Sequence, residues 1–177
     1  MSIEVNGIAH IQLSVAKPES IPFWESLCNF LEMKTLLRND TTVYCIGSRT
    51  GVLARLIPTG SPAPAFNQDS PGLHHFCFRA RSRTDVDKIF DFVSQQTNAR
   101  IVHGPKDGDE FAPGYYSILF EDPDGIRVEF NYVPGRGHFG EHGRLGEQGA
   151  GVATHYSEKG LTDSAIPTQS KDSESRL

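Results

Sequence analysis

Apolar and polar residues alternate in two segments that resemble each other, GIAHIQLSV from Gly7 and GLHHFCFRA from Gly72. Alternation over this length predicts a strand with one buried face. Each segment is followed by residues with apolar side chains at helical spacing, which predicts an amphipathic helix. The chain therefore contains an internal repeat, in which His10 and His75 occupy equivalent places.

The two predicted helices cover residues 20–31 and 82–96. Ser82 is the expected N-cap of the second helix, with Asp85 completing a capping box. Pro22 falls in the first turn of the first helix, where a missing N–H is tolerated. The side chains expected to be buried are Phe23, Trp24, Leu27 and Phe30 in the first helix and Val86, Ile89, Phe90 and Val93 in the second.

Three short strands are predicted after each helix. They cover residues 33–37, 42–46 and 52–57 in the first half and 100–103, 115–120 and 127–132 in the second. The predicted fold class is therefore α+β, with two βαβββ modules at about 7–58 and 72–134. The proline-bearing segment 59–72 is the expected linker, so that residues 1–134 form the folded domain.

The composition changes after Pro134. Eight of the 17 glycines lie between residues 135 and 160, and serine, threonine and charged residues follow. Because such a segment cannot supply a core, residues 135–177 are predicted to form a partly disordered tail. His138 and His142 have H-x-x-x-H spacing, which binds metal only on a helix, and the surrounding glycines argue against one.

Composition and charge exclude several function classes. The 177 residues carry a net charge of -5 with both signs interspersed, which argues against a broad basic face for nucleic acid. No apolar run approaches the ~20 residues of a membrane span. The start, MSIEVNGIAH, does not look like a secretory signal, so a cytoplasmic protein with a small-molecule substrate is expected. Cys28, Cys45 and Cys77 are predicted to be reduced.

Strand alternation places His10 and His75 on the faces opposite the predicted helices. A third ligand is expected from a neighbouring strand, and Glu129 follows the turn Asp122–Gly125 in EDPDGIRVEF. Two histidines and one carboxylate form a facial triad that binds a divalent metal and leaves coordination positions open. Each residue alone is more often structural or solvated, but their joint occurrence in the repeat favours metal. His74 is expected on the opposite face and is left out.

The segments HIQLSV and HHFCFRA, with the hairpin EDPDGIRVEF, resemble the vicinal oxygen chelate superfamily over Gly7–Pro134. That superfamily includes glyoxalase I, extradiol dioxygenases, fosfomycin-resistance enzymes and bleomycin-resistance proteins. The resemblance implies two βαβββ modules whose sheets curl into a mixed-sheet cup around the metal. It also implies that His10, His75 and Glu129 are the ligands and that the chain can form a homodimer.

This chain departs from the residue patterns of individual families within the superfamily, and these departures narrow the reactions that the resemblance implies. Glyoxalase I has a fourth, carboxylate ligand where this chain has Ala54 and Arg55. Extradiol dioxygenases share the three-ligand set but usually have a tyrosine close to the turn, where this chain has Leu119 and Phe120. Fosfomycin-resistance enzymes have a threonine where this chain has Gln12.

Other polar residues complete the predicted site. The candidate catalytic residues are Tyr115, Tyr116 and Gln12, and the candidate substrate-binding residues are Arg79, Arg127, Asn131 and Cys77. Each has a structural alternative: a tyrosine can pack, Gln12 and Asn131 can hydrogen-bond each other or water, and an exposed arginine needs no function. The loop at residues 105–114 is either a lid or a plain solvated loop.

The predicted function is that of a metal-dependent enzyme of dioxygenase or lyase/isomerase type, acting on a small oxygenated compound chelated to the metal. Fe²⁺ is the favoured ion, with Mn²⁺, Zn²⁺ and Ni²⁺ as alternatives. The rival hypothesis is a metal-free protein that sequesters an aromatic or drug-like ligand, as bleomycin-resistance proteins do. A third is a scaffold that acts through protein contacts.

Overall fold

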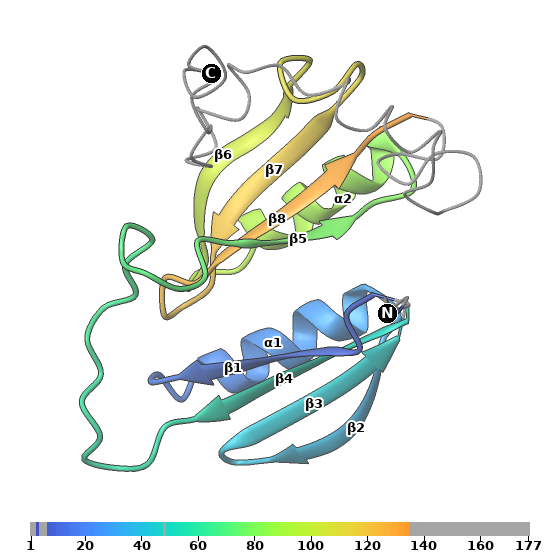
Figure 1. The fold of residues 1–177 in the computed structure, drawn as a ribbon. Coiled ribbons are helices and arrows are strands. Elements are labelled where there is room, and N and C mark those ends of the chain that lie inside the picture. Colours follow the sequence, from blue (N-terminus) through green and yellow to red (C-terminus); the bar gives the residue numbers. More distant parts are fainter. Residues whose placement is uncertain (1–2, 4–6, 48, 135–177) are drawn as a thin grey trace. The chain divides into compact units, whose positions relative to one another are not determined.

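The computed structural model describes residues 3, 7–47 and 49–134. Within them the order of strand, helix and three strands occurs twice, which confirms the two predicted βαβββ modules (Figure 1). The strands form two four-stranded mixed sheets. The predicted tail, with His138 and His142, lies outside the described residues. The chain divides into two compact units, the first containing residues 1–75, 94–100 and 120–127, and the second the remainder.

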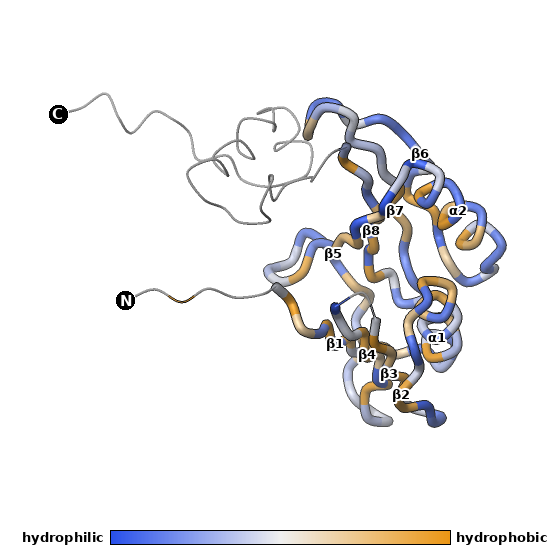
Figure 2. The backbone as a smooth tube through the Cα atoms, turned by 90° about the vertical axis from the view of Figure 1, so that its right-hand side faces the viewer, coloured by the Kyte–Doolittle hydropathy of each residue, from blue (hydrophilic) through white to orange (hydrophobic). Residues whose placement is uncertain are grey.

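The sheet of the first unit has the order β1-β4-β3-β2, with β1 parallel to β4 and the other pairs antiparallel. Its strands are β1 (His10–Val15), β2 (Lys34–Asn39), β3 (Thr42–Gly47) and β4 (Thr50–Leu56). Helix α1 (Ser20–Phe30) packs against β2, β3 and β4. Hydrophobic residues recur along β1, β4 and α1 (Figure 2). The side chains that α1 buries include Ile21, Phe23, Trp24, Leu27 and Cys28.

The turn between β7 and β8 belongs to the first unit and is tied to α1. The Asp124 carboxylate accepts hydrogen bonds from the backbone N–H of Ala16 at 2.9 Å and the hydroxyl of Ser20 at 2.5 Å. The Asp122 carboxylate accepts one from Trp24 Nε1 at 2.9 Å. Gly125 has φ of 89°, a conformation that favours glycine. The Asp-Pro-Asp-Gly sequence therefore anchors the start of α1.

Asp122 is buried, with 3 % of its surface exposed. Its Oδ1 also accepts hydrogen bonds from the backbone N–H groups of Asp124 at 2.9 Å and Ile126 at 2.8 Å. Burial raises the pKa of Asp122 to about 6, although these N–H donors act in the opposite direction. The carboxylate is therefore the shared acceptor of two backbone groups and the Trp24 indole.

The second sheet has the order β5-β8-β7-β6, with β5 parallel to β8. Its strands are β5 (Phe76–Arg79), β6 (Arg100–Asp107), β7 (Tyr116–Glu121) and β8 (Arg127–Tyr132). Helix α2 (Arg83–Ser94) buries Val86, Ile89 and Val93. Ser82 Oγ accepts the N–H of Asp85 at 3.1 Å, which confirms the predicted N-cap.

Several element boundaries differ by a few residues from the predictions. Strand β5 begins at Phe76, so that His75 precedes it, and α2 ends at Ser94 rather than at residue 96. Strand β6 continues to Asp107 through Pro105, which shortens the predicted loop at residues 105–114. Proline is tolerated there because β6 lies at the edge of its sheet, where an N–H is not needed for pairing on the outer side.

Cys28, Cys45 and Cys77 are free thiols, in agreement with the prediction that they are reduced. Cys28 and Cys45 are buried, whereas Cys77 retains exposed surface. Burial, followed by the neighbouring Cys45, raises the pKa of Cys28 far above its ordinary value. Among the described residues, no helix has both the length and the apolar character needed to cross a membrane.

Candidate functional site

Glu129 lies in a hydrogen-bonded group of side chains in the second unit. Tyr115 donates its hydroxyl to Glu129 Oε1 at 2.5 Å, and Asn131 Nδ2 donates to the Tyr115 hydroxyl oxygen at 3.0 Å. The parallel register of β5 and β8 pairs Cys77 with Glu129, which places both side chains on one face. We call Tyr115, Glu129, Asn131 and Cys77 the Glu129 network. The structure thus brings four of the predicted site residues together.

The pKa values of Tyr115 and Cys77 are both raised in the Glu129 network. Burial and the Glu129 carboxylate raise the pKa of Tyr115 far above its ordinary value, so its hydroxyl keeps its proton. The protein surrounding Cys77 desolvates its thiol although some surface remains exposed, and this, with Glu129, raises the pKa of Cys77 well above the ordinary value. Glu129 therefore has neutral hydrogen-bond donors beside it.

His103 is a further candidate that was not singled out from the sequence. It lies on β6, half-buried, and its Nδ1 is 2.9 Å from the carbonyl oxygen of Gly104. A carbonyl only accepts, so Nδ1 carries the proton and Nε2 has a lone pair. Burial lowers the pKa of His103, and the field of the Glu129 carboxylate raises it. The signal available in the sequence was a histidine in the predicted strand 100–103.

His10 and Gln12 lie on the exposed side of β1, where strand alternation placed them. Leu13 and Val15 on the same strand are buried, as expected for the side that faces the helix. Gln12 pairs with Leu53, and His10 pairs with Gly51. The first unit therefore presents an imidazole and an amide on one open strand face.

Gly51 is the close neighbour of His10. A β-carbon at Gly51 would lie 2.9 Å from Cε2 and 3.0 Å from the hydroxyl oxygen of Tyr44, and 3.3 Å from Cβ of His10. Tyr44 is thus stacked across the glycine beside His10. The absence of a side chain at position 51 lets the tyrosine ring lie against the strand.

We expect Gly51→Ala to displace the Tyr44 ring, which the new methyl group would approach to 2.9 Å, and to press on the β-carbon of His10 at 3.3 Å. The expected result is metal binding weakened by roughly tenfold, within the range seen when support of a ligand is lost. Equilibrium dialysis with Zn²⁺ measures it. The double variant Gly51→Ala, Tyr44→Ala relieves the contact with the ring, and unchanged binding in the single variant would show that His10 does not depend on this packing.

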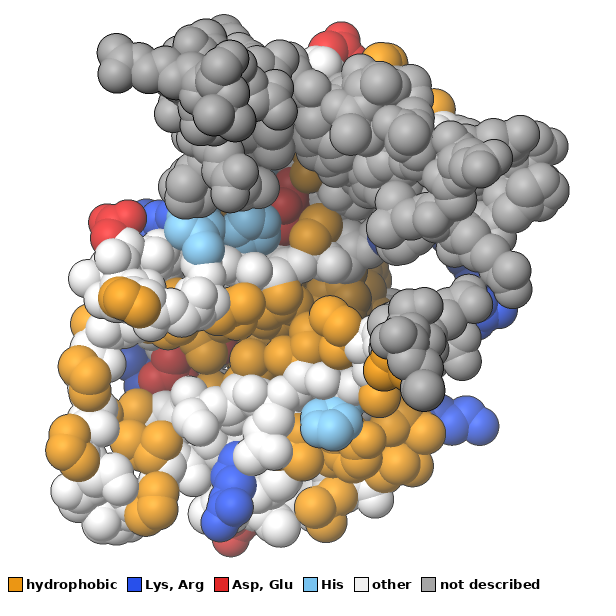
Figure 3. Space-filling model, in the orientation of Figure 1, with side chains coloured by type: hydrophobic (Ala, Val, Ile, Leu, Met, Phe, Trp, Pro, Cys, Tyr) orange, Lys and Arg blue, Asp and Glu red, His pale blue; other side chains and the backbone are white. Residues whose placement is uncertain are grey.

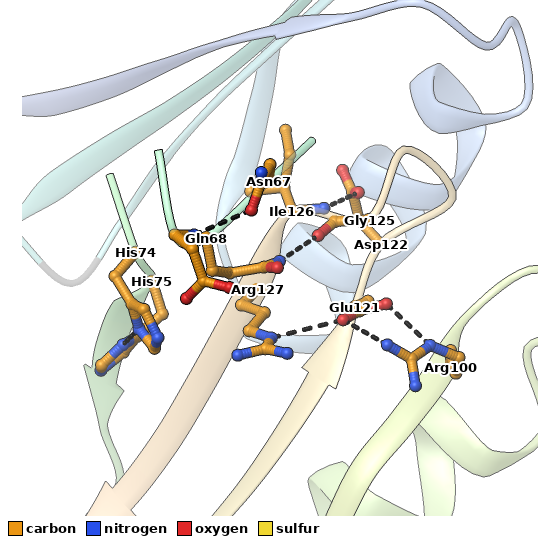
Figure 4. Close-up of polar contacts among 11 residues, drawn as sticks. Asn67, Gln68, His74, His75, Arg100, Glu121, Asp122, Gly125, Ile126 and Arg127 are labelled. Atoms are coloured by element: carbon orange, nitrogen blue, oxygen red, sulfur yellow. Dashed lines mark hydrogen bonds and ion pairs between the residues drawn. The ribbon is translucent and has the colours of Figure 1, made fainter. Parts of the chain in front are cut away.

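His74 and His75 approach each other, which corrects the expectation that they point to opposite faces. Their Nδ1 atoms are 2.7 Å apart, and both rings are seen together in Figure 4. The expectation failed because both residues precede β5, so strand alternation does not govern them. Burial, followed by the charges of His75 and Arg127, lowers the pKa of His74. Histidine side chains reach the surface in Figure 3, in keeping with the exposed His10 and half-buried His74 and His75.

The two predicted arginines differ in their surroundings. Arg127 Nε lies 3.3 Å from Glu121 Oε1, and Arg100 makes two hydrogen bonds to the same carboxylate at 2.5 and 2.8 Å (Figure 4). Arg79 is exposed and pairs with Asn131 in the β5–β8 register. The positive charge of Arg127 is therefore partly neutralised by Glu121.

Tyr116 has contacts with α2 rather than with the Glu129 network. Its hydroxyl donates to Asp87 Oδ1 at 2.7 Å, and the Arg83 guanidinium lies 3.7 Å from the centre of its ring. Tyr116 is the first residue of β7, whereas Tyr115 precedes the strand, and their hydroxyl groups have different partners. The structure thus assigns the two adjacent tyrosines different environments.

The fourth carboxylate ligand expected of glyoxalase I is absent from β4. The register places Gly51, Leu53 and Arg55 on the same strand face as His10 and Gln12, because residues paired in parallel strands share a face. Ala54 is completely buried on the other face. This face of β4 therefore offers no carboxylate.

The predicted metal ligands are distributed over both units. His10 and His75 belong to the first and Glu129 to the second. No group of three His, Cys, Asp or Glu side chains placed to hold an ion occurs among the residues that the structure describes. Two imidazoles and a carboxylate are a donor set that suits divalent Fe, Mn, Zn and Ni. By its chemistry, the predicted triad fits the metal that the resemblance implies.

Comparisons with known proteins agree with the fold. The model of the Glyoxalase/Bleomycin resistance protein/Dioxygenase superfamily matches residues 7–130. No curated protein matches the chain in sequence. A glyoxalase candidate from Bacillus halodurans is similar at 25% identity with a TM-score of 0.61, covering 72% of this chain and 96% of that one.

Two further solved structures resemble the chain in fold. One is a glyoxylase/bleomycin resistance protein/dioxygenase domain from Frankia sp. EAN1pec, with 23% identity, a TM-score of 0.57 and coverage of 73% of this chain and 98% of that one. The other is lactoylglutathione lyase from Agrobacterium tumefaciens, with 19% identity, a TM-score of 0.52 and coverage of 73% and 95%.

Proposed function

We propose that this chain is a divalent-metal-dependent enzyme of dioxygenase or lyase/isomerase type. The chain belongs to the Glyoxalase/Bleomycin resistance protein/Dioxygenase superfamily, which supports this proposal. Its proposed substrate is a small organic compound that chelates the metal through two neighbouring oxygens. The observation that carries the proposal is the Glu129 network, in which a carboxylate on β8 is held by the Tyr115 hydroxyl at 2.5 Å.

In this proposal His10, His75 and Glu129 hold the metal. A divalent ion bound by them acts as a Lewis acid toward substrate oxygen. With no carboxylate on the open face of β4, three protein ligands leave room for a chelating substrate. Fe²⁺ is the proposed ion, since it also supports oxygen chemistry, and Mn²⁺, Zn²⁺ and Ni²⁺ are the alternatives.

The polar residues around the proposed ligands have separate tasks. Tyr115 keeps its proton and orients Glu129 through its hydroxyl, while Asn131 fixes the tyrosine from the other side. His103 has an unprotonated Nε2, which suits a group that accepts a proton. Gln12 shares the open face of β1 with His10 and is proposed to bind a polar substrate group.

The proposal is tested by supplying the metal-free protein with each ion and then with catechols or 2-oxo-aldehyde thiol adducts. Oxygen uptake with a catechol supports the dioxygenase branch, and conversion of the adduct without oxygen uptake supports the lyase/isomerase branch. Binding of an aromatic ligand with no bound metal and no turnover favours the metal-free binding protein instead.

We expect Tyr115→Phe to lower kcat by roughly 10- to 100-fold, the range for loss of a side chain that orients a metal ligand. The variant keeps the ring but loses the hydroxyl between Glu129 and Asn131. The metal content, measured by elemental analysis, should stay at the wild-type value, since the Glu129 carboxylate remains. The reaction rate is measured with whichever substrate the wild-type protein converts.

Tyr132→Phe is the matched control, because Tyr132 lies on the same strand as Glu129 at opposite parity. Its kcat should equal that of the wild type. An equal kcat in Tyr115→Phe would remove Tyr115 from the proposed machinery. Loss of metal in that variant would instead mean that the hydroxyl serves binding and not the chemical step.

A further inference from the structure

His74 and His75 form a side-chain pair, of which the proposed function uses only His75. Their Nδ1 atoms are 2.7 Å apart, and the rings are nearly perpendicular, with centres 5.0 Å apart and an angle of 78° between their planes. Figure 4 shows the two rings in contact just before β5. The distance is that of a hydrogen bond between two ring nitrogens.

A hydrogen bond between two Nδ1 atoms fixes the protons of both rings. One Nδ1 must carry the proton and the other must offer its lone pair, because a neutral imidazole has one N–H and one acceptor nitrogen. The donor ring then has an unprotonated Nε2, and the acceptor ring has a protonated Nε2. Only the donor ring of the pair can therefore bind a metal through Nε2.

We propose that His74 is a positioning residue that accepts the Nδ1 proton of His75 and so holds His75 in the form whose Nε2 binds the metal. This inference rests on the proposed function, in which His75 is a ligand. Histidine ligands commonly donate their second N–H to a carboxylate, a carbonyl or water, and that bond fixes the tautomer and the orientation of the ring. Here a neighbouring imidazole takes that place.

Sequence adjacency makes the arrangement specific. Both residues lie outside a regular strand, and this allows two consecutive side chains to converge, whereas within β5 they would diverge. The converging rings also restrict each other's rotation, since each is half-buried and they touch edge to face. His74 thus supplies both an acceptor and a steric support for His75.

The test measures Zn²⁺ affinity and stoichiometry in the full chain by isothermal titration calorimetry, together with the visible spectrum of the Co²⁺ form. His74→Leu removes the acceptor, and His74→Asn replaces it with an amide oxygen close to the position of Nδ1. We expect His74→Leu to weaken Zn²⁺ binding by roughly 10- to 100-fold, the range for loss of such a partner. His74→Asn should remain within a few-fold of the wild type, and each protein should bind one ion with the same Co²⁺ spectrum.

Leu73→Ala, an exposed neighbour, is the control for local disturbance and should bind like the wild type. Should His74→Leu not fold, His74→Gln takes its place, since its longer amide does not reproduce the acceptor position. Wild-type affinity in both His74→Leu and His74→Gln overturns the inference. Equal loss in the Asn and Leu variants with an altered Co²⁺ spectrum also overturns it, because His74 would then be a ligand. A wild-type protein that binds no ion contradicts the proposed function instead.

Discussion

Asp122→Ala is expected to lower the free energy of unfolding by about 3 kcal/mol or more. The substitution leaves the Trp24 indole N–H and the backbone N–H groups of Asp124 and Ile126 without their acceptor. A buried donor left unsatisfied costs roughly 1–3 kcal/mol. Asp122 and Trp24 are both buried, so water replaces the carboxylate only by entering a packed region. Urea unfolding followed by tryptophan fluorescence measures the loss.

The same substitution at Asp109 is the matched control. Asp109 is exposed and accepts one hydrogen bond, from the N–H of Gly114 at 2.7 Å. Its replacement by alanine should cost less than about 1 kcal/mol, the usual value for a surface position. If Asp122→Ala unfolds at the same urea concentration as the wild type, the tie between the turn and α1 does not stabilise the fold.

Glu129→Gln is expected to weaken divalent-metal binding by at least about a hundredfold. Loss of an outer partner of a ligand costs up to about a hundredfold, and Glu129 is itself a proposed ligand. The amide keeps the size of the side chain and an oxygen that accepts from Tyr115, but it loses the negative charge. His10→Ala should have an effect of similar size, because it removes another of the three proposed ligands. Isothermal titration calorimetry with Zn²⁺ and Mn²⁺ measures both.

Ser14→Ala is the control for His10, since Ser14 shares the exposed side of β1 and has no ligand chemistry at neutral pH. Its metal affinity should match the wild type, and circular dichroism should show that all three variants fold. Unchanged affinity in folded Glu129→Gln would exclude Glu129 as a ligand. Unchanged affinity in His10→Ala alone would restrict the site to the remaining residues.

The elements that follow from local pattern were predictable. The repeat, the βαβββ order and the N-cap at Ser82 depend on residues close in sequence, and the structure confirms them. The open face of β1, with His10 and Gln12, likewise follows from alternation. These features need only the period of the strand or helix and the chemistry of one cap.

Features that depend on distant residues or on strand ends were not predictable in the same way. The bond from Trp24 to Asp122 joins residues 98 positions apart, and nothing in either local pattern requires it. The convergence of His74 and His75 was not predicted, because strand alternation was applied to both residues, whereas β5 begins only at Phe76. Pro105 suggested a loop, whereas the edge position of β6 allows the strand to continue.

Tyr115 and Tyr116 also combine a feature that the sequence predicts with one that depends on distant residues. The sequence placed both as candidates in a predicted strand at residues 115–120, whereas the observed strand begins at Tyr116. Which side carried Glu129 became clear only from the hydrogen bonds of Tyr115 to Glu129 and of Tyr116 to Asp87. His103 was overlooked because a single histidine in a strand gives no signal until its neighbours are known.

The central claim, that this chain binds one divalent metal ion, is tested most directly by the metal content of the wild-type protein. The protein is stripped with a chelator, supplied separately with Fe²⁺, Mn²⁺, Zn²⁺ and Ni²⁺, dialysed and submitted to elemental analysis. The account predicts one tightly held ion per chain with at least one of these metals. Retention of none of the four by the folded protein would contradict it.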